Sequence, residues 1–365
     1  MDILHLYKDY HPVLGGIENH MKVLAEAQVA AGTQVTVLVC SPGRRTQVET
    51  LNGVRIIKAG RLATVASMPL SLAQLLALRR MKPDVVHIHS PYPLGEMANW
   101  LWGRGRATVI TYHSDVVRQR GWLRLYAPVL RRVLEAVDRI IVDSQPYIDT
   151  STWLQAVRHK CVAVPIGVDA QRFVPSPRTP LDKPAVLFVG RLRYYKGLDV
   201  LLRALASTPE IQLLVVGDGP MRGVWEALAQ ELGLSDQVCF AGDVDDADLP
   251  RWYQKADVFV LPSNSRAEAY GIVLLEAMAS GLPCIATELG TGTSWIVQDG
   301  TTGIVVPPED PLALAGAMAG LLEDPDLCRS MGRAGRERVE RHFSVERMTR
   351  GVEDVYQSVL AQAGY

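Results

Sequence analysis

The chain has 365 residues, which is enough for two α/β domains with separate hydrophobic cores. Its composition, 48% hydrophobic and 21% charged with a formal net charge of −1, is ordinary for a soluble globular protein. The odd number of scattered cysteines, none in a CxxC pair, argues against a disulfide framework or a zinc site and favours a reducing cytoplasm; they are Cys40, Cys161, Cys239, Cys284 and Cys328.

No targeting segment is recognised. The N-terminal run MDILHLYKDY has no cationic start followed by a long apolar stretch, so we expect no signal peptide. No stretch reaches about 18 uninterrupted apolar residues, so we expect no membrane span and a cytoplasmic location. The first half, to about residue 172, is net basic and the remainder is net acidic. This asymmetry indicates either an anionic partner for the first half or a simple drift of charge between two solvated surfaces.

The first half alternates short apolar strands with helices. Strands are predicted at 2–7, 34–40, 54–58, 84–89, 108–112 and 139–143, and a helix is predicted at 17–31. Strands that are continuously apolar and separated by helices indicate a parallel sheet covered on both faces.

The pattern starts again after a proline-rich stretch. Residues 165–184 contain five prolines and predict a linker. Strands follow at 185–189, 213–217, 238–241, 258–261, 284–286 and 304–306, with helices at 198–206 and 225–232. The sequence thus predicts two Rossmann-like, doubly wound domains, 1–165 and 185–344, joined by a linker at 166–184 and facing each other across a cleft. The helix from about 345 to 365 is expected to pack back on the first domain.

A carboxylate interrupts an apolar helix in the segment EAYGIVLLEAMA, 268–279. The helix, predicted to begin near Tyr270, is apolar on nearly every side and should be buried, yet Glu276 lies in its middle. An unpaired buried carboxylate is costly, so a basic residue or a ligand hydroxyl must compensate it, and a vicinal diol can donate two hydrogen bonds to it. Glu268 precedes this helix, where the free amides of residues 270–272 suit an anion. The alternative is a Glu276–Arg pair beside an ordinary loop glutamate.

Two cations follow the predicted strand 185–189. In GRLRYYKG, 190–197, Arg191 and Lys196 lie at the carboxyl end of that strand, where a diphosphate would match their charges. The alternative is an exposed basic loop.

Glycines and a histidine mark the corresponding loops of the first half. Gly15 and Gly16 precede the first helix and would let backbone amides approach a phosphate, although no GxGxxG is present. His113 follows the strand 108–112 and is a candidate contact to a sugar or a leaving phosphate, or a structural histidine. VVGDGP, 215–220, is better explained as a tight turn. No Ser/His/Asp triad, P-loop or cluster of metal ligands is recognised, so we expect no metal.

Together these segments resemble the retaining glycosyltransferases of the GT-B fold, specifically glycosyltransferase family 4. EAYGIVLLE is similar to the family's Glu-x7-Glu motif, GRLRYYKG to its phosphate-binding Arg/Lys motif, and GGIE to its N-terminal glycine loop. GDGP, CFAGDV and GLPCIAT occur in the family's order, and the resemblance covers essentially the whole chain. One departure is PIGVD, 165–169, in which Ile166 replaces the asparagine of PNGVD and puts any polar role there in doubt.

The resemblance implies a role for each candidate residue. Glu276 would bind the nucleotide ribose, and Glu268 would face the transferred sugar. The diphosphate would meet Arg191, Lys196 and the amides of Tyr270, Gly271 and Ile272. Gly15, Gly16 and Gly190 would line the same site, Phe240 would pass the base, and His113 would lie near the sugar. The implied catalytic residues are therefore Glu268, His113, Arg191 and Lys196. Cations and amides would absorb the leaving-group charge, so no cofactor or metal is expected.

The implied substrates are a nucleoside diphosphate sugar, with GDP-mannose favoured over a UDP-sugar, and a glycan, lipid-linked or small-molecule acceptor. Basic residues interleaved with Trp122 and Tyr126 indicate contact with an anionic membrane surface or lipid phosphate, or else a solvated helix face; they are Arg118, Arg120, Arg124, Arg131, Arg132 and Arg139. Nucleic acid is not expected as a partner. The alternatives are a sugar-nucleotide epimerase of the same fold, a non-catalytic nucleotide-binding protein and an NAD-dependent dehydrogenase, although the last would require the missing GxGxxG.

Overall fold

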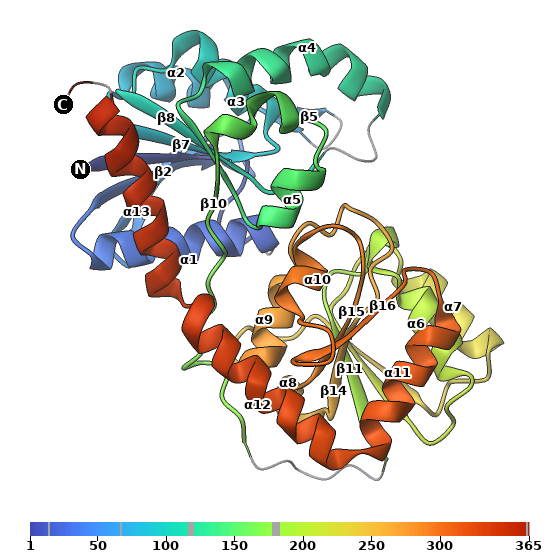
Figure 1. Cartoon of the computed structure of the whole chain (residues 1–365). Helices are drawn as coiled ribbons and strands as arrows, with labels where there is room; N and C mark the ends of the chain where they lie inside the picture. Colours follow the sequence, from blue (N-terminus) through green and yellow to red (C-terminus); the bar gives the residue numbers. More distant parts are fainter. Residues whose placement is uncertain (14, 66–67, 116–119, 177–182, 363, 365) are drawn as a thin grey trace. The chain divides into compact units, whose positions relative to one another are not determined.

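The computed structural model describes residues 1–13, 15–65, 68–115, 120–176, 183–362 and 364, and it contains two compact units (Figure 1). Unit 1 comprises Met1–Gly167 and Val345–Tyr365, and unit 2 comprises Val168–Ser344. From Val168 onward, the stretch predicted as a linker belongs to unit 2.

Unit 1 is built on an eight-stranded sheet. Its strand order is β10 (Cys161–Ala163), β9 (Arg139–Val142), β8 (Ala107–Tyr112), β7 (Val85–Ser90), β1 (Asp2–Leu6), β2 (Gln34–Cys40), β4 (Val54–Ala59) and β3 (Gln47–Leu51). All neighbours are parallel except β3 and β4, which form an antiparallel pair at the edge. The short strands β5 (Ala63–Val65) and β6 (Met68–Leu70) form a separate antiparallel pair. The predicted parallel sheet is confirmed, but two of its strands were not predicted. Strand β3 has the polar, exposed sequence QVETL, and β10 has only three residues.

Helices cover both faces of this sheet (Figure 1). One face carries α1 (Gly16–Ala30) and the C-terminal α13 (Val345–Gln362), and the other carries α2 (Leu72–Arg80), α3 (Pro93–Trp102) and α4 (Arg120–Ala136). The short α5 (Gln145–Thr150) follows β9. The last helix is fixed in unit 1 by Tyr356, which is fully buried and whose hydroxyl lies 2.6 Å from His87 Nδ1 on β7.

Unit 2 contains a second, entirely parallel sheet. Its order is β13 (Val238–Gly242), β12 (Gln212–Val216), β11 (Ala185–Val189), β14 (Val258–Leu261), β15 (Cys284–Thr287) and β16 (Gly303–Val306). Its helices are α6 (Leu198–Leu205), α7 (Arg222–Glu231), α8 (Leu249–Lys255), α9 (Ile272–Ala279), α10 (Gly292–Ile296), α11 (Pro311–Glu323) and α12 (Pro325–His342). The central strands β11 and β14 are buried along their whole length, which explains their continuous apolar sequences.

The strand order of unit 2 reverses between β11 and β14. At such a switch point the loops leaving the two strands diverge and open a crevice at their carboxyl ends. The loop after β11 is GRLRYYKG, and the loop after β14 runs through Ser263 to Glu268. The sheet topology therefore brings together two segments that are far apart in the sequence.

Candidate nucleotide and sugar site

The centre of the unit 2 site is a buried ion pair. Lys196 Nζ lies 2.6 Å from Glu268 Oε2, and each side chain is only 10% exposed. Ser263 Oγ donates a hydrogen bond of 3.2 Å to the same carboxylate oxygen. Lys196 ends a short 3₁₀ turn, Tyr194–Lys196, and its ammonium lies against Gly190, where an added Cβ would come within 3.3 Å of Nζ. Burial lowers the pKa of Lys196, but Glu268, with smaller contributions from Tyr195 and Glu276, outweighs burial, so the pKa is raised overall.

Glu276 faces the same surroundings from the middle of α9. Tyr253 donates a hydrogen bond of 2.7 Å to Glu276 Oε2, and both side chains are buried. Burial raises the pKa of Glu276, while the Tyr253 hydrogen bond, Arg172 and Lys196 act in the opposite direction. The sequence alternatives were a paired arginine or a ligand, and the direct partner in the structure is a tyrosine. One hydroxyl cannot use the full accepting capacity of a carboxylate.

The first turn of α9 presents its backbone beside these acids. The helix begins at Ile272, two residues later than predicted, because Gly271 adopts a left-handed conformation with φ of 87°. An added Cβ at Gly271 would lie 3.0 Å from Leu261 Cδ2 and from Leu274 Cδ1, so the position favours glycine both sterically and conformationally. Tyr270 is buried, and Ile272 is partly buried as the first helical residue. The amide of Leu274 already donates to the Gly271 carbonyl at 2.9 Å, whereas the amides that begin a helix have no intrahelical acceptor and suit an anion.

Arg191 and Phe240 are two further residues predicted for the site. Arg191 directly follows Gly190 but is exposed, and it makes no ion pair among the residues that the structure describes. Phe240 on β13 is partly buried and packs against the core of unit 2. The structure thus brings Lys196, Glu268 and Gly190 together and leaves the guanidinium of Arg191 in solvent.

The glycine loop of unit 1 has an acidic neighbour. Gly15 caps α1 in an extended conformation, and an added Cβ there would come within 2.2 Å of Glu18 Oε2. The predicted role of Gly15 and Gly16 with a phosphate therefore has a competitor, since the Glu18 carboxylate occupies part of this loop. Burial raises the pKa of Glu18. Leu14 of the same motif lies outside the described residues.

His113 belongs to a buried cluster that the sequence reading missed. His113 Nδ1 lies 3.2 Å from Asp143 Oδ2, and His113 Nε2 lies 3.1 Å from His89 Nδ1. Ring nitrogens lie within 4.8 Å of one another in two groups, namely His5, His87 and His89, and His20, His89 and His113. These groups were not recognised from the sequence because the histidines are dispersed along it, and the expectation of no metal stays a prediction. The available clue was HIHS at 87–90, where alternate strand residues share a face.

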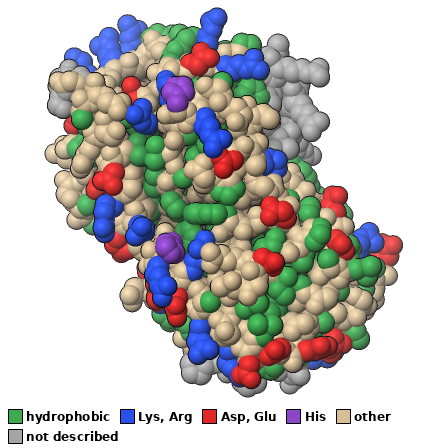
Figure 2. Space-filling view, viewed as in Figure 1, with side chains coloured by type: hydrophobic (Ala, Val, Ile, Leu, Met, Phe, Trp, Pro, Cys, Tyr) green, Lys and Arg blue, Asp and Glu red, His purple; other side chains and the backbone are tan. Residues whose placement is uncertain are grey.

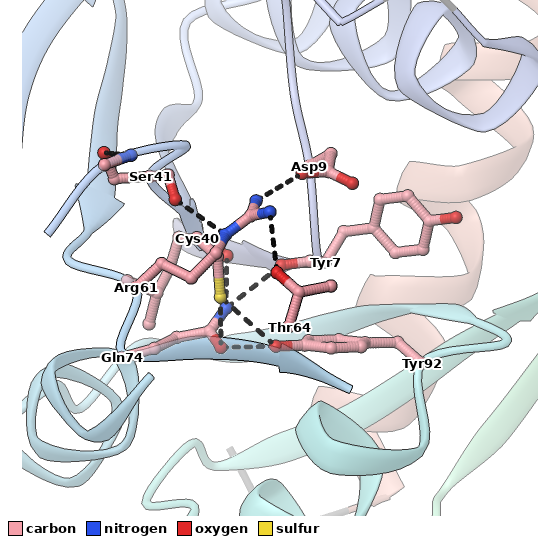
Figure 3. A network of polar contacts seen from close by, with 10 residues as sticks. Tyr7, Asp9, Cys40, Ser41, Arg61, Thr64, Gln74 and Tyr92 are labelled. Carbon is pink, nitrogen blue, oxygen red and sulfur yellow. Dashed lines mark hydrogen bonds and ion pairs between the residues drawn. The ribbon is translucent and has the colours of Figure 1, made fainter. Parts of the chain in front are cut away.

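A second polar network joins the strand ends of unit 1 (Figure 3). Gln74 Nε2 donates to the carbonyl of Tyr7 at 3.0 Å and to that of Leu38 at 3.4 Å, while Tyr92 donates to Gln74 Oε1. Arg61 connects the loop after β4 to Asp9 at 3.1 Å and to the carbonyl of Ser41 at 2.9 Å. These bonds fix the loops at the carboxyl edge of β1, β2 and β4.

The proposed membrane surface is only partly described. Arg118 and the side chains of Arg120, Trp122 and Arg124 lie outside the described residues. Arg131 and Arg132 on α4 are exposed, whereas Tyr126 is partly buried and bonds to Glu96. Figure 2 shows Lys and Arg side chains spread over the visible face of unit 1. Among the described residues, no helix combines the length and apolarity needed to cross a bilayer.

Comparison with known proteins gives matches along the chain. The family Glycosyl transferases group 1 matches residues 169–338, and Glycosyltransferase Family 4 matches residues 14–172. A D-rhamnosyltransferase of Pseudomonas aeruginosa is 38% identical over 94% of this chain and 92% of its own length. The O-antigen chain mannosyltransferase C of Escherichia coli is 35% identical over 99% of both chains.

Solved structures share the architecture. Sucrose-phosphate synthase from Thermosynechococcus elongatus superimposes with a TM-score of 0.85 and 27% identity over 99% of both chains. Anabaena HepE, solved in complex with UDP-glucose, gives a TM-score of 0.80 at 19% identity over 98% of this chain and 100% of its own. These matches confirm the predicted GT-B fold.

Proposed function

Since this chain belongs to the group 1 glycosyl transferases and is a hexosyltransferase, we propose that it transfers mannose from GDP-mannose to a glycan or lipid-linked acceptor with retention of anomeric configuration. The observation that carries this assignment is the buried Lys196–Glu268 pair beside Glu276 and the first turn of α9. It combines a cation, the N-terminal amides of a helix and two carboxylates at the switch point of one sheet.

Each part of this site matches a part of a nucleotide sugar. The Lys196 ammonium and the α9 amides would hold the diphosphate, and the exposed Arg191 is free to swing onto it. Glu276 would accept hydrogen bonds from the ribose hydroxyls in addition to the one from Tyr253. Glu268 would orient Lys196 and accept from a sugar hydroxyl. These fixed charges would stabilise the negative charge on the departing diphosphate.

The relatives favour mannose as the transferred sugar. One relative is a D-rhamnosyltransferase and another an O-antigen mannosyltransferase, and D-rhamnose is mannose that lacks one hydroxyl. A pocket that accepts either sugar must recognise the shared ring hydroxyls. UDP-sugars are the second choice, since HepE, which has the same fold, was solved with UDP-glucose.

The decisive experiment is a donor panel of GDP-mannose, GDP-rhamnose, UDP-glucose and ADP-glucose, with nucleotide release as the readout and the product anomer assigned by NMR. We expect release of GDP from GDP-mannose, and a product in which the anomeric configuration of the donor is retained. Lys196→Ala should abolish release, and Arg251→Ala, an exposed control in unit 2, should not. Release from UDP-glucose alone would overturn the donor assignment. Acceptor-independent conversion of the donor into its epimer would instead favour the epimerase.

We propose that transfer needs no divalent metal ion, because Lys196, Arg191 and the α9 amides suffice to neutralise the leaving group. EDTA should leave the transfer rate unchanged. A loss of rate that Mg²⁺ restores would contradict this.

The acceptor side is proposed to meet the inner face of an anionic membrane in the cytoplasm. Trp100, Leu101 and Trp102 are at least 40% exposed at the end of α3, and Arg131 and Arg132 are exposed on α4. Exposed aromatic and basic side chains suit the membrane interface. The protein should float with anionic but not neutral liposomes, and Arg131→Ser with Arg132→Ser should weaken the flotation. Equal flotation with neutral liposomes would refute an electrostatic contact.

A further inference from the structure

Imidazole rings form a line through the interior of unit 1. His5 Nδ1 lies 3.0 Å from His89 Nε2, and His89 Nδ1 lies 3.1 Å from His113 Nε2. Gln28 Oε1, 2.8 Å from His5 Nε2, ends the line on one side, and Asp143 Oδ2 ends it on the other. All five side chains are buried. His113 is the member that, by the resemblance to glycosyltransferase family 4, would lie near the sugar.

The ring geometry is that of hydrogen bonds and not of ligands around one metal ion. The His89 and His113 rings are almost parallel, with an interplanar angle of 8°, and their centroids are 5.4 Å apart. For His5 and His89 the centroid separation is 5.3 Å. The facing nitrogens of these pairs are 3.0 and 3.1 Å apart. The rest of each centroid separation is about the sum of two ring radii, so each nitrogen lies close to the line that joins the two centroids. The facing nitrogens therefore point directly at each other, which leaves no space for an ion between them.

Hydrogen-bond direction can be followed along the line from Gln28. Its Oε1 can only accept, so His5 Nε2 carries hydrogen, and a neutral ring then accepts at Nδ1 from His89 Nε2–H. By the same reasoning, His89 Nδ1 accepts from His113 Nε2–H. His113 Nδ1 now faces a carboxylate oxygen that also only accepts. One additional proton is needed there, and it makes His113 an imidazolium paired with Asp143.

The surroundings agree with a single charge at this end of the line. Burial lowers the pKa of His5 to about 4 and those of His20 and His89 well below the usual value, so these rings are neutral at neutral pH. A charge on His113 acts in the same direction on His20 and His89. The titratable groups facing His113 are Glu18 and His20 from α1, His89 from β7 and Asp143 after β9. Both ring nitrogens of His20 lack a partner among the described residues.

We propose that His5, His89 and Asp143 are positioning residues that hold His113 as an imidazolium. Gln28, at the other end of the line, sets the tautomers of His5 and His89. The inference rests on the proposed function only for the use of this charge, which would be to stabilise the negative charge that develops on the donor. If the Gln28 amide turned over, every N–H in the line would reverse and His113 would become neutral. The orientation of one buried amide is thus coupled to the charge on the candidate catalytic histidine.

The tautomers can be read directly from the intact protein. In the full chain labelled with ¹⁵N-histidine, long-range nitrogen–proton spectra at pH 7 should show both His113 nitrogens protonated and hydrogen on Nε2 of His5 and His89. His159, which is exposed, serves as the reference signal for a histidine outside the line. A neutral His113, or hydrogen on Nδ1 of His89, would overturn the proposal, whatever the enzyme's activity.

The pH dependence of kcat/KM then tests the use of the charge. His89→Leu interrupts the line without altering His113 or Asp143, and His5→Leu interrupts it one ring farther away. Both should move the alkaline limb of the profile to lower pH, whereas His159→Leu should leave it in place. An unchanged profile in folded His89→Leu protein would overturn the positioning role. If the wild type turned over no donor, the proposed function would fail. The nitrogen spectra would still test the tautomers and the charge in the histidine line.

Discussion

The Lys196–Glu268 pair makes a quantitative prediction about stability. Two unit charges 2.6 Å apart attract by about 6 kcal/mol at an effective dielectric constant of about 20, and desolvation of the buried partners offsets much of this. Glu268→Gln keeps the shape of the side chain and removes its charge, so the desolvated ammonium of Lys196 loses its nearest counter-charge. Removing one partner of a buried pair costs about 3–5 kcal/mol. We expect the lower end of this range, because Glu276 also attracts Lys196.

The same substitution should make stability depend on pH. In the wild type Glu268 opposes the effect of burial and keeps the pKa of Lys196 raised. Without Glu268, burial should lower that pKa beneath its unfolded value of about 10.4, so the unfolded state would bind more protons. Relative to the wild type, the stability of Glu268→Gln should therefore rise as the pH increases from the lowered pKa of Lys196 towards about 10.4.

Urea unfolding at several pH values, followed by fluorescence and circular dichroism, measures both effects. The matched control is the double variant Lys196→Met with Glu268→Leu, which removes both charges and should recover most of the stability while still failing to bind nucleotide. If Glu268→Gln were as stable as the wild type and its stability depended on pH in the same way, the claim that the two side chains form a buried pair would be refuted.

Three further outcomes are expected. Glu276→Gln should weaken nucleotide binding in calorimetry, and unchanged affinity would contradict the role of Glu276. The variant should be at least as stable as the wild type at pH 7, because burial raises the pKa of Glu276 and its ionisation opposes folding above about pH 4. Gly271→Ala should lower the unfolding free energy by about 1–2 kcal/mol and weaken nucleotide binding, because φ is 87° and the added Cβ meets Leu274. An unchanged free energy of unfolding together with unchanged affinity would contradict this role of Gly271. Gln74→Leu should cost about 1–3 kcal/mol in thermal unfolding by leaving the Tyr7 carbonyl without its side-chain donor, and an unaltered transition would show that the Figure 3 network adds nothing.

Local sequence was sufficient for most strands of the two sheets and for the unusual glutamate in α9. Apolar runs predicted the parallel strands, because strand burial on both faces leaves a continuous local pattern. Glu276 was recognised as anomalous from its immediate neighbours in an apolar helix. The polar strand β3 and the left-handed start of α9 at Gly271 were missed, since edge pairing and a single backbone angle leave weak patterns.

Tertiary structure alone decided which polar groups meet. Lys196 and Glu268 became partners because the reversal between β11 and β14 places their loops at one edge. The histidine line required β1, β7 and β8 to be adjacent in the sheet, with His5 in register with His87. Sequence spacing determines which residues share the face of one strand, but strand order and register determine which strands lie side by side, and those depend on the packing of the whole domain.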